Sequence, residues 1–166
     1  QLLRQNYSVM TTLQEQTTIR KLAANEKMPY DLLLLADPSA TMINTYLPFS
    51  DVYVLEQKKQ VIAVYALLKD NDMLEIKNIA VNPAHQGKGL GKILLQDAAQ
   101  RARAGGFKRL CIGTGNSSIA QLNLYQRQGF EITSIRKNYF TTHYPEPIYE
   151  NGIQCRHLIV LEKWLG

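Results

Sequence analysis

Three glycines at alternate positions, Gly87, Gly89 and Gly91, separate two strongly patterned segments. The segment 74–81 is apolar and typical of a strand, whereas 89–105 has apolar residues at the i, i+3, i+4 spacing of a helix. A turn of this kind directs several backbone N–H groups toward one point, where the helix dipole adds about half a positive charge. Glycine lets the backbone approach a bulky anion that a Cβ would keep away. The turn therefore predicts a site for a phosphate or pyrophosphate.

Two common phosphate motifs fit this turn poorly. A Walker loop needs Gly-Lys followed by Ser or Thr, but Gly89 follows Lys88 and Ile93 follows Lys92. A dinucleotide fingerprint needs G-x-G-x-x-G after the first strand of a βαβ unit, whereas G-x-G-x-G here follows strands with the pattern of an antiparallel meander. A glycine-rich helix start that binds no ligand stays open as the alternative.

The rest of the chain alternates apolar runs with polar turns. The expected strands are 18–22, 51–56, 61–68, 74–81, 110–114, 130–135 and 155–161, and the expected helices are 29–36, 39–47, 89–105 and 117–128. This order predicts an α/β (α+β) fold with a mixed, mostly antiparallel central sheet of about seven strands and helices on both faces. The 166 residues have the length of one domain, 1–166, in which we expect 1–12 to be a ragged N-terminal extension.

Composition excludes several classes of protein. The chain has no run of 18 apolar residues, and 1–12 lacks the apolar core of a signal peptide, so we expect no membrane partner and no secretion. Cys111 and Cys155 lack metal-ligand spacing, which predicts two free thiols in a cytoplasmic protein and no metal site. The net charge of +5 favours anionic partners. We expect no nucleic acid among them, because the chain lacks a basic helix and the aromatic and basic interleaving of RNA modules.

Two stretches carry a resemblance to a known family. The stretch 86–91, Gln-Gly-Lys-Gly-Leu-Gly, resembles the Q/R-x-x-G-x-G/A signature of the GCN5-related N-acetyltransferase (GNAT) superfamily. Asn116 and 124–130 resemble its N…hY-x-x-x-G-F segment, and the resemblance covers about 18–164. It implies a single GNAT-type domain that transfers an acetyl group from acetyl-CoA to a primary amine by direct attack in a ternary complex, and a homodimer is common in the family. The alternative is a CoA-binding sensor or regulatory module without catalysis.

The resemblance assigns the glycine turn to the pyrophosphate of acetyl-CoA. The implied contacts are the backbone groups of Gln86, Gly87, Lys88, Gly89, Leu90, Gly91 and Lys92. The side chains of Lys88 and Lys92 also meet phosphate charge, or they are solvated lysines.

The resemblance also assigns cofactor contacts outside the turn. Ile79, Ala80 and Val81 pair with the pantetheine arm, and the Ile79 N–H polarises the thioester where a bulge splays two parallel strands. Asn116 contacts the cofactor through its amide, or caps the following helix, or does both.

Tyr125 and Glu75 are the candidate catalytic residues. A CoA thiolate with a pKa of about 8.5 can take a proton from a tyrosine with a pKa of about 10, and Tyr125 matches the position of this acid in many family members. The alternative is a core aromatic. Glu75 matches the glutamate base of one branch of the family, and alternation places it on one strand face with Lys77 and Ile79. A Glu75–Lys77 ion pair, a water chain or a later carboxylate are the alternatives.

The connection 136–154 is longer than a hairpin needs, and long connections in compact proteins are commonly functional. It holds four aromatics, two prolines and two carboxylates, Glu146 and Glu150, which would attract an amine or amino-sugar acceptor. The alternative is a packed loop that meets a partner subunit. Because the chain is basic, we expect a small-molecule amine or an exposed protein amine rather than a polycationic peptide.

Overall fold

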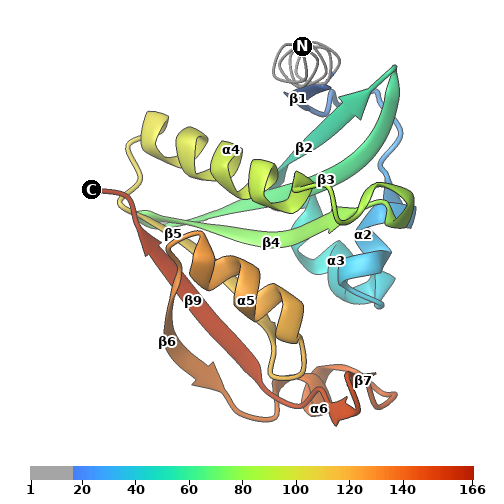
Figure 1. The fold of residues 1–166 in the computed structure, drawn as a ribbon, viewed down its shortest axis with the longest axis vertical. Coiled ribbons are helices and arrows are strands. Elements are labelled where there is room, and N and C mark those ends of the chain that lie inside the picture. Colours follow the sequence, from blue (N-terminus) through green and yellow to red (C-terminus); the bar gives the residue numbers. More distant parts are fainter. Residues whose placement is uncertain (1–16) are drawn as a thin grey trace, which may run out of the picture.

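One seven-stranded sheet organises the computed structural model, which describes residues 17–166. Its strands lie in the order β1-β2-β3-β4-β5-β9-β6 (Figure 1). They are β1 (Thr17–Lys21), β2 (Ser50–Gln57), β3 (Gln60–Asp70), β4 (Met73–Val81), β5 (Arg109–Gly115), β9 (Leu158–Trp164) and β6 (Glu131–Arg136). Among the described strands only β4 and β5 pair in parallel, which confirms the predicted mixed, mostly antiparallel sheet. The extension predicted for 1–12 lies outside the described residues.

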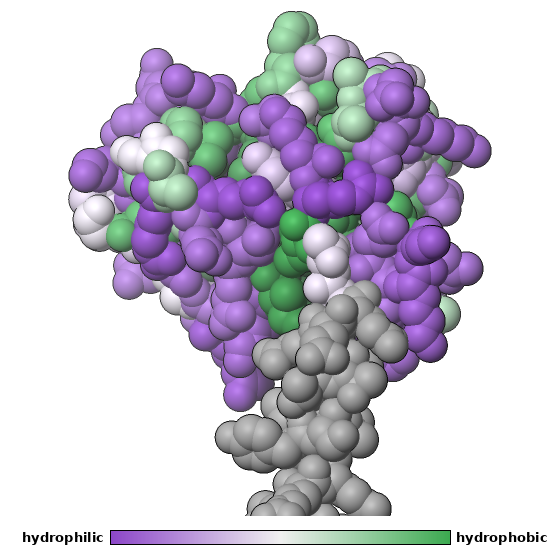
Figure 2. Space-filling view, turned by 90° about the horizontal axis from the view of Figure 1, so that it is seen from above, coloured by the Kyte–Doolittle hydropathy of each residue, from purple (hydrophilic) through white to green (hydrophobic). Residues whose placement is uncertain are grey.

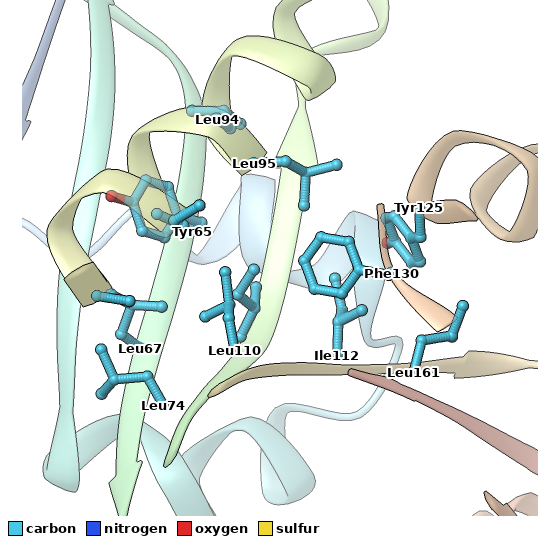
Figure 3. Packing of buried hydrophobic residues seen from close by; sticks show 14 of the residues in the cluster. Tyr65, Leu67, Leu74, Leu94, Leu95, Leu110, Ile112, Tyr125, Phe130 and Leu161 are labelled. Carbon is cyan, nitrogen blue, oxygen red and sulfur yellow. The ribbon is translucent and has the colours of Figure 1, made fainter. Parts of the chain in front are cut away.

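Helices cover both faces of the sheet (Figure 1). The helices are α2 (Tyr30–Ala36), α3 (Ala40–Tyr46), α4 (Leu90–Ala104), α5 (Ile119–Arg127) and α6 (Tyr139–His143), with short 3₁₀ turns at Leu47–Phe49 and Pro83–His85. The apolar stripe of α4, which includes Leu94, Leu95 and Ala98, is buried against β3, β4 and β5. Figure 3 shows this core continuing through Ile112 to Phe130 and Tyr125.

A second buried cluster lies under α2 and α3. Alternate residues of β3 divide between the two clusters: Tyr65 packs toward α4, whereas Val64 and Ala66 pack toward α2 and α3. The face seen from above in Figure 2 is mostly hydrophilic. Among the described residues, no helix is both long and apolar enough to cross a membrane.

A bulge in β4 positions the functional part of the molecule. Ala66 of β3 pairs with Asn78 and the next residue of β3 pairs with Ile76, so Lys77 is the extra residue. The parallel pairing of β4 with β5 also ends at Ile76, and the two strands separate beyond it. The expectation that Glu75 and Lys77 share a face with Ile79 is therefore wrong. Lys77 lies over a ring of α3, whereas Ile79 packs into the cluster beneath α4.

The connection after β6 contains more regular structure than predicted. It folds into α6 and a small hairpin of β7 (Tyr149–Glu150) and β8 (Ile153–Gln154), and β9 begins at Leu158 rather than at residue 155. The hairpin turns through Asn151 and Gly152, both with positive φ. An Asn-Gly pair is the preferred sequence for such a turn, so this element could have been predicted.

Candidate active site

A cavity of about 600 Å³ passes through the opening between β4 and β5. Its walls come from both strands, from α4 and α5 on one face of the sheet, and from α2, α3 and α6 on the other. Every catalytic and cofactor-binding residue predicted from the sequence lines this cavity except Lys88 and Asn116. The cavity therefore joins the glycine turn to the far face of the sheet.

The glycine turn forms one end of the cavity. Gly87 has φ +76° and Gly89 has φ +79°, a left-handed conformation that favours glycine, and a Cβ at either position would meet open space. Gly89 is the N-cap of the 15-residue α4, and no side chain among the described residues caps this helix. The N–H groups of its first turn are therefore available to an anion. The Gln86 amide donates to the Val81 carbonyl at 3.0 Å and so fixes the turn to the end of β4.

Tyr125 lies on α5 and lines the cavity. Its side chain is 5% exposed and packs against Phe130, with the ring centroids 6.2 Å apart (Figure 3). Burial raises the pKa of Tyr125 above its usual value of about 10, so the hydroxyl stays protonated at neutral pH. The hydroxyl has no hydrogen-bond partner among the described residues. Tyr125 is thus both a core aromatic and a lining residue whose hydroxyl is free to donate.

Glu75 lines the cavity from β4, next to the bulge. Its carboxylate lies 3.4 Å from the Lys77 ammonium, and each side chain is about a quarter exposed, 25% in both cases. The Lys77 ammonium also lies 5.4 Å above the centroid of the Tyr46 ring. The alternative of a Glu75–Lys77 pair is therefore confirmed, and the pair faces the cavity rather than bulk solvent alone.

Asn116 has a different position from the one expected. Its Oδ1 accepts from the backbone N–H groups of Arg156 and His157 at 2.8 and 2.9 Å, and its Nδ2 donates to the Gln154 carbonyl at 3.1 Å. The N-cap of α5 is Ser118, so the expectation that Asn116 caps this helix is wrong. The Asn116 amide instead holds the chain that enters β9, because that chain passes beside the end of β5. The predicted contact of Asn116 with the cofactor stays a prediction.

The far end of the cavity is acidic and aromatic. Asp37, from the turn between α2 and α3, accepts a hydrogen bond from the Tyr144 hydroxyl at 2.8 Å and from the Ser39 N–H at 3.1 Å. Glu150 accepts from the Ser118 hydroxyl at 3.2 and 3.3 Å. Glu150 lines the cavity as expected near the acceptor, but the exposed Glu146 does not. Sequence reasoning missed Asp37, because its place before Pro38 indicated only the end of a helix.

The tyrosines at this end are neutral at physiological pH. Burial raises the pKa of Tyr46 to about 12 and also raises the pKa of Tyr139 and Tyr144, with a further increase from the Asp37 charge in all three. Both cysteines are free and buried, as expected, and burial raises the pKa of each thiol. No group of metal-binding side chains occurs within 17–166.

A mixed sheet that splays at a bulge, with a glycine-rich helix start beside the opening, defines the acetyltransferases of the GNAT class. The chain belongs to this family: residues 14–130 match the model of the acetyltransferase (GNAT) family. A relative from Bacillus subtilis, the uncharacterized N-acetyltransferase YvbK, is 48% identical over 133 residues, which span 80% of this chain and 86% of the relative.

Two solved structures show the same fold at similar identity. A GNAT family acetyltransferase from Elizabethkingia anophelis, with acetyl-CoA bound, has a TM-score of 0.89 and 47% identity, and the match covers 91% of this chain and 99% of that one. An IAA acetyltransferase from Bacillus cereus has a TM-score of 0.86 and 48% identity, and the match covers 90% and 99%.

Proposed function

We propose that this chain transfers the acetyl group of acetyl-CoA to a primary amine by direct attack in a ternary complex. The observation that carries the proposal is the cavity itself, which joins an anion-binding helix start to an acidic chamber through the gap between β4 and β5. One substrate can enter from each face of the sheet and meet the other at the bulge. The E. anophelis relative binds acetyl-CoA, which supports the same cosubstrate here.

The glycine turn binds the pyrophosphate in this proposal. The first-turn N–H groups of α4 donate to phosphate oxygens, and Lys92, which lines the cavity, adds positive charge. Lys88 lies outside the lining and acts, at most, from solvent. Ile79, Ala80 and Val81 then offer backbone groups on the side of β4 that β5 leaves unpaired. An N–H group of this segment, which we assign to Ile79, polarises the thioester carbonyl.

Glu75 and Tyr125 divide the proton transfers between them. An amine is protonated at neutral pH, and Glu75 accepts a proton from it directly or through a water, so that the neutral nitrogen can attack the carbonyl carbon. The C–S bond breaks as the new C–N bond is completed. The buried Tyr125 hydroxyl then donates to the departing sulfur, and its raised pKa keeps it protonated until that moment. The attacking nitrogen releases its second proton, directly or through a water, to the tyrosinate, which restores the hydroxyl and leaves a neutral amide and the CoA thiol.

Ligand-induced stabilisation and thiol release test this proposal. Acetyl-CoA at 100 times its Kd stabilises a single-site binder by about 2.7 kcal/mol, which is readily measured as a rise in Tm. A panel of primary amines is then assayed for release of free CoA. No rise in Tm at saturating acetyl-CoA would contradict the proposal, whereas a rise without thiol release from any amine would favour the CoA-binding sensor.

A further inference from the structure

The two ends of the cavity carry opposite charge. Lys92 and His85 line the end with the glycine turn, and no carboxylate of the described residues lines it. Three carboxylates, Asp37, Glu75 and Glu150, line the other end. The net charge of the whole chain is +5, so this acidic end is a local departure from the overall balance.

Among residues 17–166, Lys77 is the one cation that lines the acidic end. It lies 3.4 Å from Glu75 and compensates its charge. Asp37 and Glu150 form no ion pair with any residue in 17–166; their partners are hydroxyl and N–H groups. Arg136 is exposed and does not line the cavity. Its charge lowers the pKa of Tyr139, but burial raises that pKa by more. Two carboxylates therefore remain uncompensated beside the cavity.

Aromatic rings complete the acidic end. Tyr46, Tyr139, Phe140 and Tyr144 line it, and the rings of Phe140 and Tyr144 lie 5.5 Å apart. Because the tyrosine hydroxyls are neutral, these rings offer their π faces and no competing charge. The Lys77 ammonium 5.4 Å above the Tyr46 ring shows that this wall already accommodates an alkylammonium group.

Asp37 is held in a fixed position at this end. Its Oδ1 accepts hydrogen bonds from the Tyr144 hydroxyl and from the Ser39 N–H. The bond from Tyr144 joins two segments that are 107 residues apart in the sequence. No described residue donates to Oδ2. An aspartate fixed in this way, with one oxygen unused, is suited to bind a second cation of known orientation.

The reacting amine alone does not account for these charges. It must be neutral when it attacks, and Glu75 suffices to take its proton. We propose that the acceptor is a small amine carrying a second, protonated amino group, which lies between Asp37 and the wall formed by Tyr46, Tyr139 and Tyr144. This inference rests on the proposed acetyl transfer and adds the class of the acceptor to it.

Matched acceptors of equal length test the inference. Thiol release is measured with 1,5-diaminopentane, pentylamine and 5-aminopentan-1-ol at saturating acetyl-CoA. We expect kcat/KM for the diamine to exceed that for each of the other two by at least tenfold. Equal values, or a preference for the uncharged tails, would overturn the inference while the acetyl transfer stands. Failure of all amines to release thiol would overturn the acetyl transfer and the inference with it.

Variants locate the preference at Asp37. In Asp37→Asn the amide oxygen can still accept from Tyr144 and Ser39, so the fold is retained and the charge is lost. We expect the ratio of diamine to pentylamine activity to fall at least fivefold in this variant, and a smaller fall in Tyr144→Phe, which leaves Asp37 charged but less fixed. Glu146→Gln is the control, because it removes an exposed carboxylate outside the cavity and should leave the ratio unchanged. A ratio that Asp37→Asn and Tyr144→Phe both leave unchanged would contradict the proposal.

Discussion

The glycine end of the cavity is lined by one short stretch, 85–92 without Lys88, whose backbone groups we assign to the cosubstrate, whereas the acidic end is lined by side chains that come from distant segments. Asp37, Glu75 and Tyr144 all line this end, although Glu75 lies 38 positions after Asp37 and Tyr144 lies 69 positions after Glu75. A binding site made of backbone groups depends on the conformation of the chain, so most side chains along it can be substituted without loss of binding. A binding site made of side chains depends on which residues are present, and each residue can be substituted independently of the others. The first arrangement suits a cosubstrate shared by many enzymes, and the second suits an acceptor that differs among them.

Tyr125 lines the cavity as the proposed proton donor, and its substitution should give the largest effect. We expect Tyr125→Phe to lower kcat by 10- to 1000-fold, the usual range for loss of a proton donor, since the ring and its packing on Phe130 are retained. Acetyl-CoA affinity should change little. The measurement is pre-steady-state thiol release with calorimetric binding of acetyl-CoA. Tyr53→Phe is the control, because Tyr53 stacks on Tyr65 away from the cavity; normal turnover of Tyr125→Phe would exclude the acid role.

Substitution of Glu75 tests whether this carboxylate acts as the general base at the acidic end. We expect Glu75→Gln to lower kcat/KM about 10- to 100-fold at pH 7 and less at pH 9, because more of the amine is already neutral in alkaline solution. Profiles of log(kcat/KM) against pH check this. Glu162→Gln removes a carboxylate on β9 that pairs with Arg109 outside the cavity, and should leave the profile unchanged. Parallel profiles for Glu75→Gln and the wild type would remove Glu75 as the base.

Gly89 tests whether backbone approach governs the glycine end. A Cβ at this position meets no protein atom within 4 Å, so it would project into the space that we assign to pyrophosphate. We expect Gly89→Val to raise the Kd for acetyl-CoA at least tenfold and to lower stability by about 1–2 kcal/mol through left-handed strain. Gly89→Asn should raise the Kd with a smaller loss of stability, because Asn tolerates this conformation.

Gly106 provides the matched control for this pair of variants. It has the same φ of +79° and the same open surroundings, but it lies beyond the other end of α4 and outside the cavity. Gly106→Asn should leave the acetyl-CoA affinity unchanged. Equal affinities for Gly89→Asn and the wild type would mean that no ligand approaches the backbone at Gly89.

The same contrast explains what the sequence could predict. The order of the seven sheet strands and of the four longer helices, and the glycine-rich helix start, follow from periodicity and from three glycines within five residues, which are local signals. The bulge at Lys77 is defined by its pairing with β3, so simple alternation placed Ile79 on the wrong face. Once one residue is extra, every side chain beyond it faces the other way.

The place of Asp37 at the acidic end could not be predicted for a similar reason. Asp37 is held by Tyr144, which lies 107 residues further along the chain, and no local pattern around Asp37 indicates that contact. Asn116 follows a strand and precedes a helix, which made a cap the natural expectation. Its amide is instead used by the chain near Arg156 and His157, and only the tertiary fold brings that chain alongside.

The smallest effect concerns Cys111, which lies opposite Glu75 where β4 and β5 are still paired. Burial, with a smaller contribution from Glu75, raises the pKa of Cys111 to about 12. The folded state therefore retains a proton that the unfolded chain loses above about pH 8.5, so stability is complete below that pH and falls as pH rises toward 12. The loss from this thiol is at most about 1.4 kcal/mol per pH unit.

Urea unfolding at pH 7, 9 and 10 measures this loss. We expect Cys111→Ala to be less stable than the wild type at pH 7 by about 1 kcal/mol, because a buried atom is removed, but to lose less stability between pH 9 and 10. Cys155, which lines the cavity at its acidic end, gives the comparison. If water and ligand reach that end, iodoacetamide should modify Cys155 faster than Cys111 in the folded protein. Faster modification of Cys111 than of Cys155 would contradict this expectation. It would mean that β4 and β5 open more readily where they are paired than where they separate beyond the bulge.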